Sequence, residues 1–283
     1  MKRTVLFLAV FAALSVMTMA QSPNDNNPSH VNYYKTPAMV KTDDINIEFS
    51  DPVAKMEYVK LKVKITNNTA YYIIFKPAEC AFVYDKEEFM VTKNSSNILK
   101  RDIIIIKPYK SASRVIDAKG SNNYHKDTFT LKIAGLTKAS ADKEAQSAPD
   151  FTLPAKANSF DAGKFTCTLK KLKKETQETV ATFTCVYNGD KIGIINPSMA
   201  VVKLENGQEF ANIESDAKPV ILEKGETDEF SVTFKVQAKI ADMQFANMLI
   251  VWKNAFVESV TKNIIVTPVP FVIDPGLTAG KNK

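Results

Sequence analysis

Two cysteines in this 283-residue sequence are spaced so that a β-hairpin would place them opposite each other. Cys167 and Cys185 lie symmetrically about residue 176, inside the stretch KKLKKETQETV, whose polar residues are typical of a hairpin tip. Directly opposed residues on paired strands have Cβ atoms about 4.5–5.5 Å apart, which is close enough for a disulfide bond. The same register also opposes two apolar pairs: Phe165 with Tyr187, and Leu169 with Phe183. The spacing therefore predicts a Cys167–Cys185 disulfide, and the alternative is two reduced cysteines buried in a core.

The same hairpin tip carries a cluster of basic residues: Lys170, Lys171, Lys173 and Lys174. A cluster of this kind could contact an anionic glycan, a lipopolysaccharide or a membrane surface. It could equally be a solubilising tip that discourages pairing at the edge of a sheet. The sequence leaves both interpretations open.

Catalytic side chains are scarce in the rest of the sequence. The two histidines, His30 and His125, fall in a polar leader and in the turn SNNYHKD, so we expect both to be loop residues. Cys80 lies on a predicted strand, and we expect it to be a small buried residue because a nucleophilic thiol needs a nearby base. The sequence contains no HExxH, CxxC or GxSxG motif and no glycine-rich phosphate loop. We therefore predict no catalytic residues, no metal ligands and no cofactor.

Paired carboxylates occur at Asp43-Asp44 and at Glu87-Glu88. Both pairs flank strands or lie in turns, which is the usual place for charged residues on a β-sandwich surface. A glycosidase needs two carboxyl groups that converge in a cleft, and a sequence does not show convergence. A secreted hydrolase thus remains an alternative.

The beginning of the chain predicts export. Lys2 and Arg3 precede an apolar stretch that ends in Thr18-Met19-Ala20, which is the pattern of a secretory signal peptide over residues 1–20. No later stretch reaches the length of a membrane span, so we expect a mature protein in the periplasm, at the cell surface or outside the cell. Removal of Lys2 and Arg3 would lower the formal net charge from +6 to +4. With only three arginines among its basic residues, the sequence argues against nucleic-acid binding.

Alternation of apolar and charged residues predicts an all-β protein. Ile45–Phe49 and Val59–Ile65 alternate in this way, and each half of the chain contains six or seven such segments separated by turn residues. This pattern predicts two tandem immunoglobulin-like β-sandwiches. One segment, Ala238–Met248, would also suit a short helix. The expected divisions are a signal peptide at 1–20, a flexible leader at 21–40, sandwiches at 41–137 and 151–268 joined by a linker at 138–150, and a C-terminal tail at 269–283.

The two halves share a weak internal repeat. ITNNTAYYIIFKPAECAFVYDKEEF, which begins at Ile65, has a looser counterpart in VYNGDKIGIINPSMAVVKLENGQEF, which begins at Val186. At a separation of 121 residues the matching pairs are Asn67 with Asn188, Ile73 with Ile194, Ile74 with Ile195, Glu88 with Glu209 and Phe89 with Phe210. Pro77 aligns with Pro197 if the second copy has one extra residue in its later turn. A period of this length predicts a duplicated domain rather than a solenoid.

The second copy, YNGDKIGIINPSMAVVKLENGQEF followed by ILEKGETDEFSVTFKV, resembles the DUF4352-like immunoglobulin-type sandwiches of exported bacterial proteins. The shared features are an Asn-led turn, a strand that ends near a proline, an Asn-Gly hairpin and a Lys-Gly-Glu turn before a VTF strand. The resemblance covers about 70 residues of the second half. It implies an extracellular binding or accessory domain without catalytic residues.

Together these observations predict an exported, non-catalytic binding or accessory protein of the bacterial envelope. Its partner would be an envelope or extracellular protein or a glycan, while the ligand and the oligomeric state stay open. A structural component of an envelope assembly, joined by strand addition at open sheet edges, is a further alternative. A cleft between the domains with converging carboxylates would favour the hydrolase.

Overall fold

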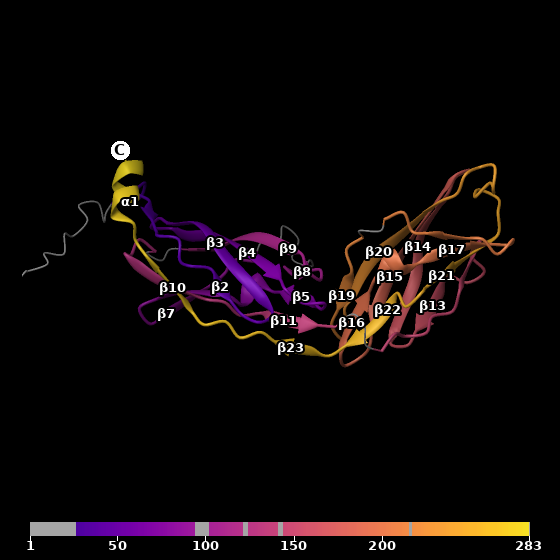
Figure 1. Cartoon of the computed structure of the whole chain (residues 1–283), viewed down its shortest axis with the longest axis horizontal. Helices are drawn as coiled ribbons and strands as arrows, with labels where there is room; N and C mark the ends of the chain where they lie inside the picture. The colour runs from indigo at the N-terminus through magenta and orange to yellow at the C-terminus, as the bar shows by residue number, and fades with distance from the viewer. Residues whose placement is uncertain (1–26, 94–101, 121–123, 141–143, 215–216, 283) are drawn as a thin grey trace, which may run out of the picture.

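The computed structural model describes residues 27–93, 102–120, 124–140, 144–214 and 217–282. Antiparallel strands make up most of this part of the chain, which confirms the predicted all-β class and is consistent with β-sandwich architecture. The predicted signal peptide lies outside the described residues. The strands gather around two large hydrophobic cores, and we call the two parts of the molecule the first and the second lobe (Figure 1).

The first lobe has three sheets around a core that includes Leu61, Phe82 and Phe129. One sheet has the order β1-β3-β4-β9, with β2 also paired to β3; the others are β24-β10-β6-β7 and β23-β11-β5-β8. The first-lobe strands are β1 (Asn32–Tyr33), β2 (Val40–Lys41), β3 (Ile45–Ala54), β4 (Tyr58–Asn67), β5 (Tyr72–Phe75), β6 (Ala81–Tyr84), β7 (Glu87–Met90), β8 (Ile104–Ile106), β9 (Ser111–Lys119), β10 (Thr128–Lys132), β11 (Leu136–Ala139), β23 (Thr261–Asn263) and β24 (Val269–Val272).

The second lobe also has three sheets, and its core is rich in aromatic residues that surround Trp252. The sheet orders are β13-β14-β15-β20, β12-β21-β17-β18 and β19-β16-β22. Its strands are β12 (Phe151–Leu153), β13 (Ser159–Ala162), β14 (Phe165–Lys174), β15 (Glu178–Tyr187), β16 (Ile192–Ile195), β17 (Val201–Leu204), β18 (Glu209–Ala211), β19 (Val220–Leu222), β20 (Thr227–Lys235), β21 (Met248–Val251) and β22 (Phe256–Ser259).

The same pairing pattern recurs in the two lobes at a separation of 120 residues. Ile45 pairs with Asn67 in the first lobe, and Phe165 pairs with Tyr187 in the second. A 3₁₀ turn also follows each equivalent strand, at η1 (Pro77–Glu79) and η2 (Pro197–Met199). Beyond η2 the β17–β18 turn contains one extra residue, as the sequence alignment of the two prolines required, so the separation becomes 121 at Glu88 and Glu209.

This register corrects the predicted alignment of the first part of the repeat. Asn67 is equivalent to Tyr187 rather than to Asn188, and Ile73 is equivalent to Gly193 rather than to Ile194. The two positions have exchanged their bulk, because the second lobe places a large ring at 187 and no side chain at 193. A Cβ atom on Gly193 would lie 2.7 Å from the rings of both Phe165 and Tyr187.

Gly193→Ala should therefore lower the free energy of unfolding by about 1–3 kcal/mol, which is the usual cost of overpacking a core. Urea denaturation would measure the loss. Gly280→Ala is the matched control, since a Cβ atom at Gly280 would meet no atom within 4 Å. An equal loss in both variants would contradict the proposed exchange of bulk between positions 187 and 193.

The two lobes pack through equivalent faces. A third, smaller core joins the outer face of the β11-β5-β8 sheet to that of the β19-β16-β22 sheet: Tyr72, Ile74, Ala139, Ile194, Ile221 and Val257. Ile74 and Ile194 occupy the same position in the two lobes and both are buried here. The contact between the lobes thus resembles the two-fold interface of a dimer within one chain.

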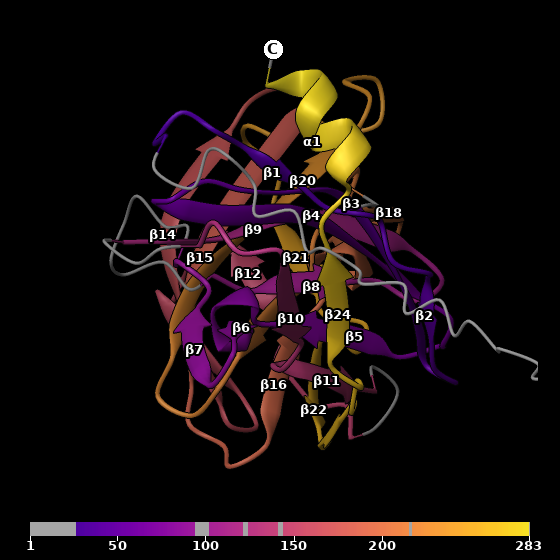
Figure 2. The ribbon, with the colours of Figure 1, turned by 90° about the vertical axis from the view of Figure 1, so that its left-hand side faces the viewer.

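The C-terminal segment crosses back from the second lobe and runs along the whole first lobe (Figure 1). After β22 it supplies β23, which pairs with β11, and β24, which pairs with β10, and it ends in helix α1 (Pro275–Lys281). Figure 2 shows β24 beside β10 in the first lobe, with α1 beyond it. We call residues 260–282 the strap. This arrangement differs from the expected tail at 269–283, because alternate strap residues are buried in the first core.

The expected linker and leader also take part in the sheets. Lys138 and Ala139 belong to β11, inside the segment expected as a linker at 138–150. Tyr34 is 2 % exposed within the expected leader at 21–40. Val31 of this segment is hydrogen-bonded to the strap. The Asn282 side chain donates a hydrogen bond to the Val31 carbonyl and accepts one from the Val31 N–H.

The ambiguous segment Ala238–Met248 forms turns, and at Met248 the start of β21, rather than a helix. The Met243 side chain is fully buried in the second core, and its N–H bonds to the Thr176 carbonyl at the tip of the β14–β15 hairpin.

Candidate binding pocket between the lobes

The predicted disulfide is present. Cys167 and Cys185 are directly paired across β14 and β15, they are bonded, and both are completely buried. The predicted register is confirmed on both sides of the bond, where Phe165 faces Tyr187 and Leu169 faces Phe183. The bond lies in the core of the second lobe, so it belongs to the scaffold rather than to a site.

The four lysines of the predicted anionic-ligand patch all lie on strand β14 rather than in the hairpin turn. Lys170 is ion-paired with Glu229, and Lys173 with Glu175. Lys174 donates a hydrogen bond of 2.9 Å to the Ala246 carbonyl, and burial lowers the pKa of its ammonium group. These bonds occupy three of the four lysines within the protein, so binding of an anion at this patch stays a prediction.

The two histidines are loop residues, as expected, but they lie together. His30 Nδ1 is 2.7 Å from His125 Nε2, and both side chains are less than a tenth exposed. The contact joins residues 95 positions apart, which no local sequence pattern could have predicted. Among the described residues no group of three or more His, Cys, Asp or Glu side chains could hold a metal ion.

Cys80 is fully buried, as the sequence predicted. Its thiol lies 3.5 Å from the Ala134 carbonyl oxygen, and burial raises its pKa to about 11. A thiol with this pKa is almost entirely protonated at neutral pH and is therefore a poor nucleophile.

The carboxylate pairs singled out in the sequence do not form a site together. Asp44 Oδ1 lies 2.7 Å from Nζ of Lys138, which belongs to the β23-β11-β5-β8 sheet facing the second lobe. Glu88 Oε1 lies 2.5 Å from Nζ of Lys132, and both of these residues belong to the β24-β10-β6-β7 sheet. Each of these carboxylates is thus engaged by its own lysine. Two other carboxylates converge instead, at a pocket that the sequence analysis did not identify.

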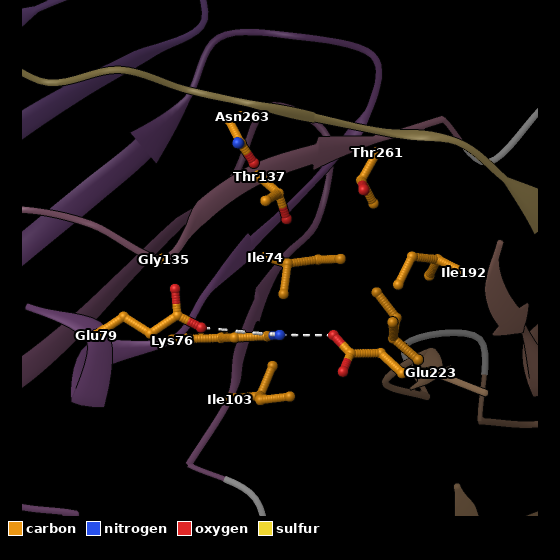
Figure 3. Close-up of a pocket in the computed structure, with 11 residues that line it drawn as sticks. Ile74, Lys76, Glu79, Ile103, Gly135, Thr137, Ile192, Glu223, Thr261 and Asn263 are labelled. Atoms are coloured by element: carbon orange, nitrogen blue, oxygen red, sulfur yellow. Dashed lines mark hydrogen bonds and ion pairs between the residues drawn. The ribbon is translucent and has the colours of Figure 1, made fainter. Parts of the chain in front are cut away.

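The pocket lies between the lobes and has a volume of about 220 Å³. Both lobes and the strap line it. Four isoleucines form its apolar part: Ile74 and Ile103 from the first lobe, and Ile192 and Ile221 from the second (Figure 3). The strap and β11 add polar groups, which are the side chains of Thr261, Asn263 and Thr137.

One ammonium group joins the two lobes at the mouth of this pocket. Lys76 Nζ lies 2.5 Å from Glu223 Oε1 of the second lobe and 3.9 Å from Glu79 Oε1 of the first (Figure 3). The three side chains are between 30 % and 53 % exposed, so water screens the pairs and each contributes at most about 1 kcal/mol. The main effect of the three side chains is to place charged groups beside the isoleucines that line the pocket.

The backbone fixes Lys76 at this position. Its N–H bonds to the Gly135 carbonyl at 2.9 Å, and Pro77 begins the 3₁₀ turn that follows. Gly135 has a φ of +68°, and a Cβ atom there would lie 2.6 Å from the Lys76 carbonyl oxygen. Only glycine therefore allows these two segments to approach so closely.

The equivalent place in the second lobe carries no lysine. Asn196 stands where Lys76 stands, and its N–H bonds to the carbonyl of Ala255, which is the counterpart of Gly135. The two lobes, which share the same strand pairing, thus differ at Lys76 and Asn196, the first of which lines the pocket. In the corrected register, the difference between Lys76 and Asn196 is the sequence signal that could have pointed to this site.

No helix in the described part of the chain is long and apolar enough to cross a membrane. The sequence matches no protein-family model, and no curated protein shows significant similarity to it.

Proposed function

We propose that this chain is an exported, non-catalytic binding or accessory protein of the bacterial envelope, built from two tandem immunoglobulin-like sandwiches, with its ligand site between them. The observation that carries the proposal is the pocket lined by both lobes and by the strap. Pockets at domain interfaces with an apolar lining and a few polar groups are the usual form of small-molecule sites. The recurrence of strand pairing at 120 residues supports the duplication.

The size and lining of the pocket define the kind of ligand. Its 220 Å³ is below the roughly 300–1,000 Å³ typical of sites for drug-sized molecules, so the ligand is the size of an amino acid or a monosaccharide unit. The isoleucines favour an apolar face on that ligand. Lys76, Glu223, Thr137 and Asn263 supply donors and acceptors for its polar groups.

Two features support export of the protein. The N-terminal sequence has the pattern of a signal peptide. The Cys167–Cys185 disulfide is typical of proteins that fold in an oxidising compartment. An envelope or extracellular protein or glycan would then be the source of the ligand.

A secreted hydrolase is the second candidate, because Glu79 and Glu223 converge on one point at the pocket. In a glycosidase, however, the space between the two carboxyl groups receives the glycosidic oxygen or a water. Here the Lys76 ammonium group occupies that space. This geometry favours binding over hydrolysis.

Thermal denaturation with a panel of free amino acids, muropeptides and short oligosaccharides tests the proposal. At least one probe should raise the stability of the wild-type protein, by about 2.7 kcal/mol when its concentration is 100 times Kd. Thr137→Trp would fill the pocket and should abolish this gain. Thr184→Trp is the matched control, since Thr184 is also half-buried on a strand but lies on the outer face of β15.

The proposal fails if no probe stabilises the wild-type protein, or if the two tryptophan variants respond equally to every probe. Hydrolysis of an oligosaccharide by the wild-type protein, lost in Glu223→Gln, would support the hydrolase instead.

A further inference from the structure

The first lobe does not complete its own sheet. In the second lobe the first strand, β12, pairs with β21 and forms the edge of the β12-β21-β17-β18 sheet. That sheet is therefore completed by a strand of the same lobe. The residues at the equivalent positions of the first lobe, 31–33, include β1, which pairs with β3 in a different sheet. The vacant place beside β10 is filled by β24, which comes from the C-terminal strap.

The strap fits this place through buried apolar side chains. Val269 and Phe271 are 5 % and 1 % exposed. The Phe271 ring stacks on Phe129 at 4.6 Å and meets the edge of Phe49 at 5.6 Å. Without the strap the first lobe would therefore expose an apolar groove along β10, with the backbone groups of that strand unpaired on one side.

The order of the chain separates the groove from the strand that fills it. The strands that form the groove are complete before the second lobe begins, whereas β24 lies near the end of the described chain. Domains fold in order during synthesis, and strand exchange between copies is a characteristic event in proteins with repeated domains. Any copy that holds an open groove can accept the same segment from a neighbour.

We propose that β24 is an exchangeable donor strand, and that the strap of a second copy of this chain can fill the groove beside β10. Strand donation of this kind occurs in chaperone–pilin complexes, where a strand from one chain completes the sheet of another. The exchanged strap would make the same four residue pairs with β10 as the strap within one chain, so exchange would conserve these contacts. The inference is independent of the proposed function of the pocket.

Directed disulfide formation between two different variants tests the exchange. Thr130 and Pro270 are paired across β10 and β24 and are not fully buried. Thr130→Cys protein and Pro270→Cys protein would be mixed in equal amounts, unfolded in urea without reductant, refolded together and oxidised. Mass spectrometry should find a 130–270 disulfide that joins the two variants, in an amount that rises with protein concentration.

The second lobe provides a matched control. Leu249 and Thr152 are the equivalent pair across β21 and β12, and both are half-buried. A mixture of Leu249→Cys and Thr152→Cys proteins should form no such bond, because both strands belong to one lobe.

The double variant Thr130→Cys with Pro270→Cys shows whether the pair can bond within one chain. An intrachain bond in the double variant, together with no 130–270 bond between copies in the mixture, would overturn the proposal. Equal bonding in both mixtures would also overturn it, since the bonds would then report random collision.

Discussion

Replacing Phe271 by alanine should lower the free energy of unfolding by about 3–5 kcal/mol, which is the usual loss for a large aromatic residue removed from a core. Phe271 is 1 % exposed, and it stacks on Phe129 in the first core although it lies on the strap that leaves the second lobe. The loss should be as large as for a residue of the lobe itself, because the strap completes the sheet. If Phe271 lay in a tail of the kind expected from the sequence, the same replacement would leave the free energy of unfolding almost unchanged.

Urea denaturation followed by circular dichroism would measure this loss. Val272→Ala is the matched control, because Val272 is the next residue of β24 and is 49 % exposed. Its replacement should change stability by less than about 0.5 kcal/mol. Similar losses in the two variants would mean that β24 is not packed on the first core as described.

Removal of the disulfide should lower stability by roughly 3 kcal/mol, as the chain-entropy model gives for a loop of this size. Cys167 and Cys185 are 18 residues apart and join β14 and β15, the two central strands of the β13-β14-β15-β20 sheet. Without the bond the unfolded chain gains conformational freedom, while the strands still pair in the native state. The second lobe should therefore still fold, with reduced stability.

The double variant Cys167→Ala with Cys185→Ala would be compared with the wild-type protein under oxidising conditions, again by urea denaturation. Cys80→Ala is the control for removal of a buried sulfur without removal of a bond, because Ala200 occupies the equivalent position in the second lobe. A reducing agent should destabilise the wild-type protein and leave the double variant unchanged. If reductant had no effect on the wild-type protein, the bond would contribute nothing to stability.

Local patterns were sufficient to predict the strands and the disulfide. Alternation along β4 buries Leu61 and Val63 and exposes the lysines between them, because a strand turns successive side chains to opposite faces. The symmetrical spacing of Cys167 and Cys185 about a polar tip fixed the register of one hairpin. Both inferences concern residues that are near each other in the sequence.

The strap and the pocket could not be predicted in this way. The alternation of Ile264, Val266, Val269 and Phe271 is compatible with a strand, but nothing in the pattern says which sheet the strand joins. The contact of Lys76 with Glu223 spans 147 positions and depends on how the lobes pack. Pairing over such distances is determined by the whole fold rather than by local preference.

The repeat shows how a partial match can mislead. Two matching asparagines suggested that Asn67 and Asn188 are equivalent, but Asn67 is buried on β4 whereas Asn188 is exposed beyond the end of β15. The buried Asn67 amide donates hydrogen bonds to the carbonyls of Tyr71, Ile106 and Lys107, a role that the larger Tyr187 does not share. The correct equivalence followed from strand pairing, because the same pairing recurs in both lobes.

The proposed function requires a small ligand to bind in the pocket between the lobes. A crystal structure of the protein with the most strongly stabilising probe would show where that probe binds. We predict that the probe lies between the lobes, with its apolar face on Ile74 and Ile192 and its polar groups within hydrogen-bond distance of Lys76 or Asn263. A probe bound to the outer face of either lobe, and absent from the pocket, would rule out the pocket as the ligand site.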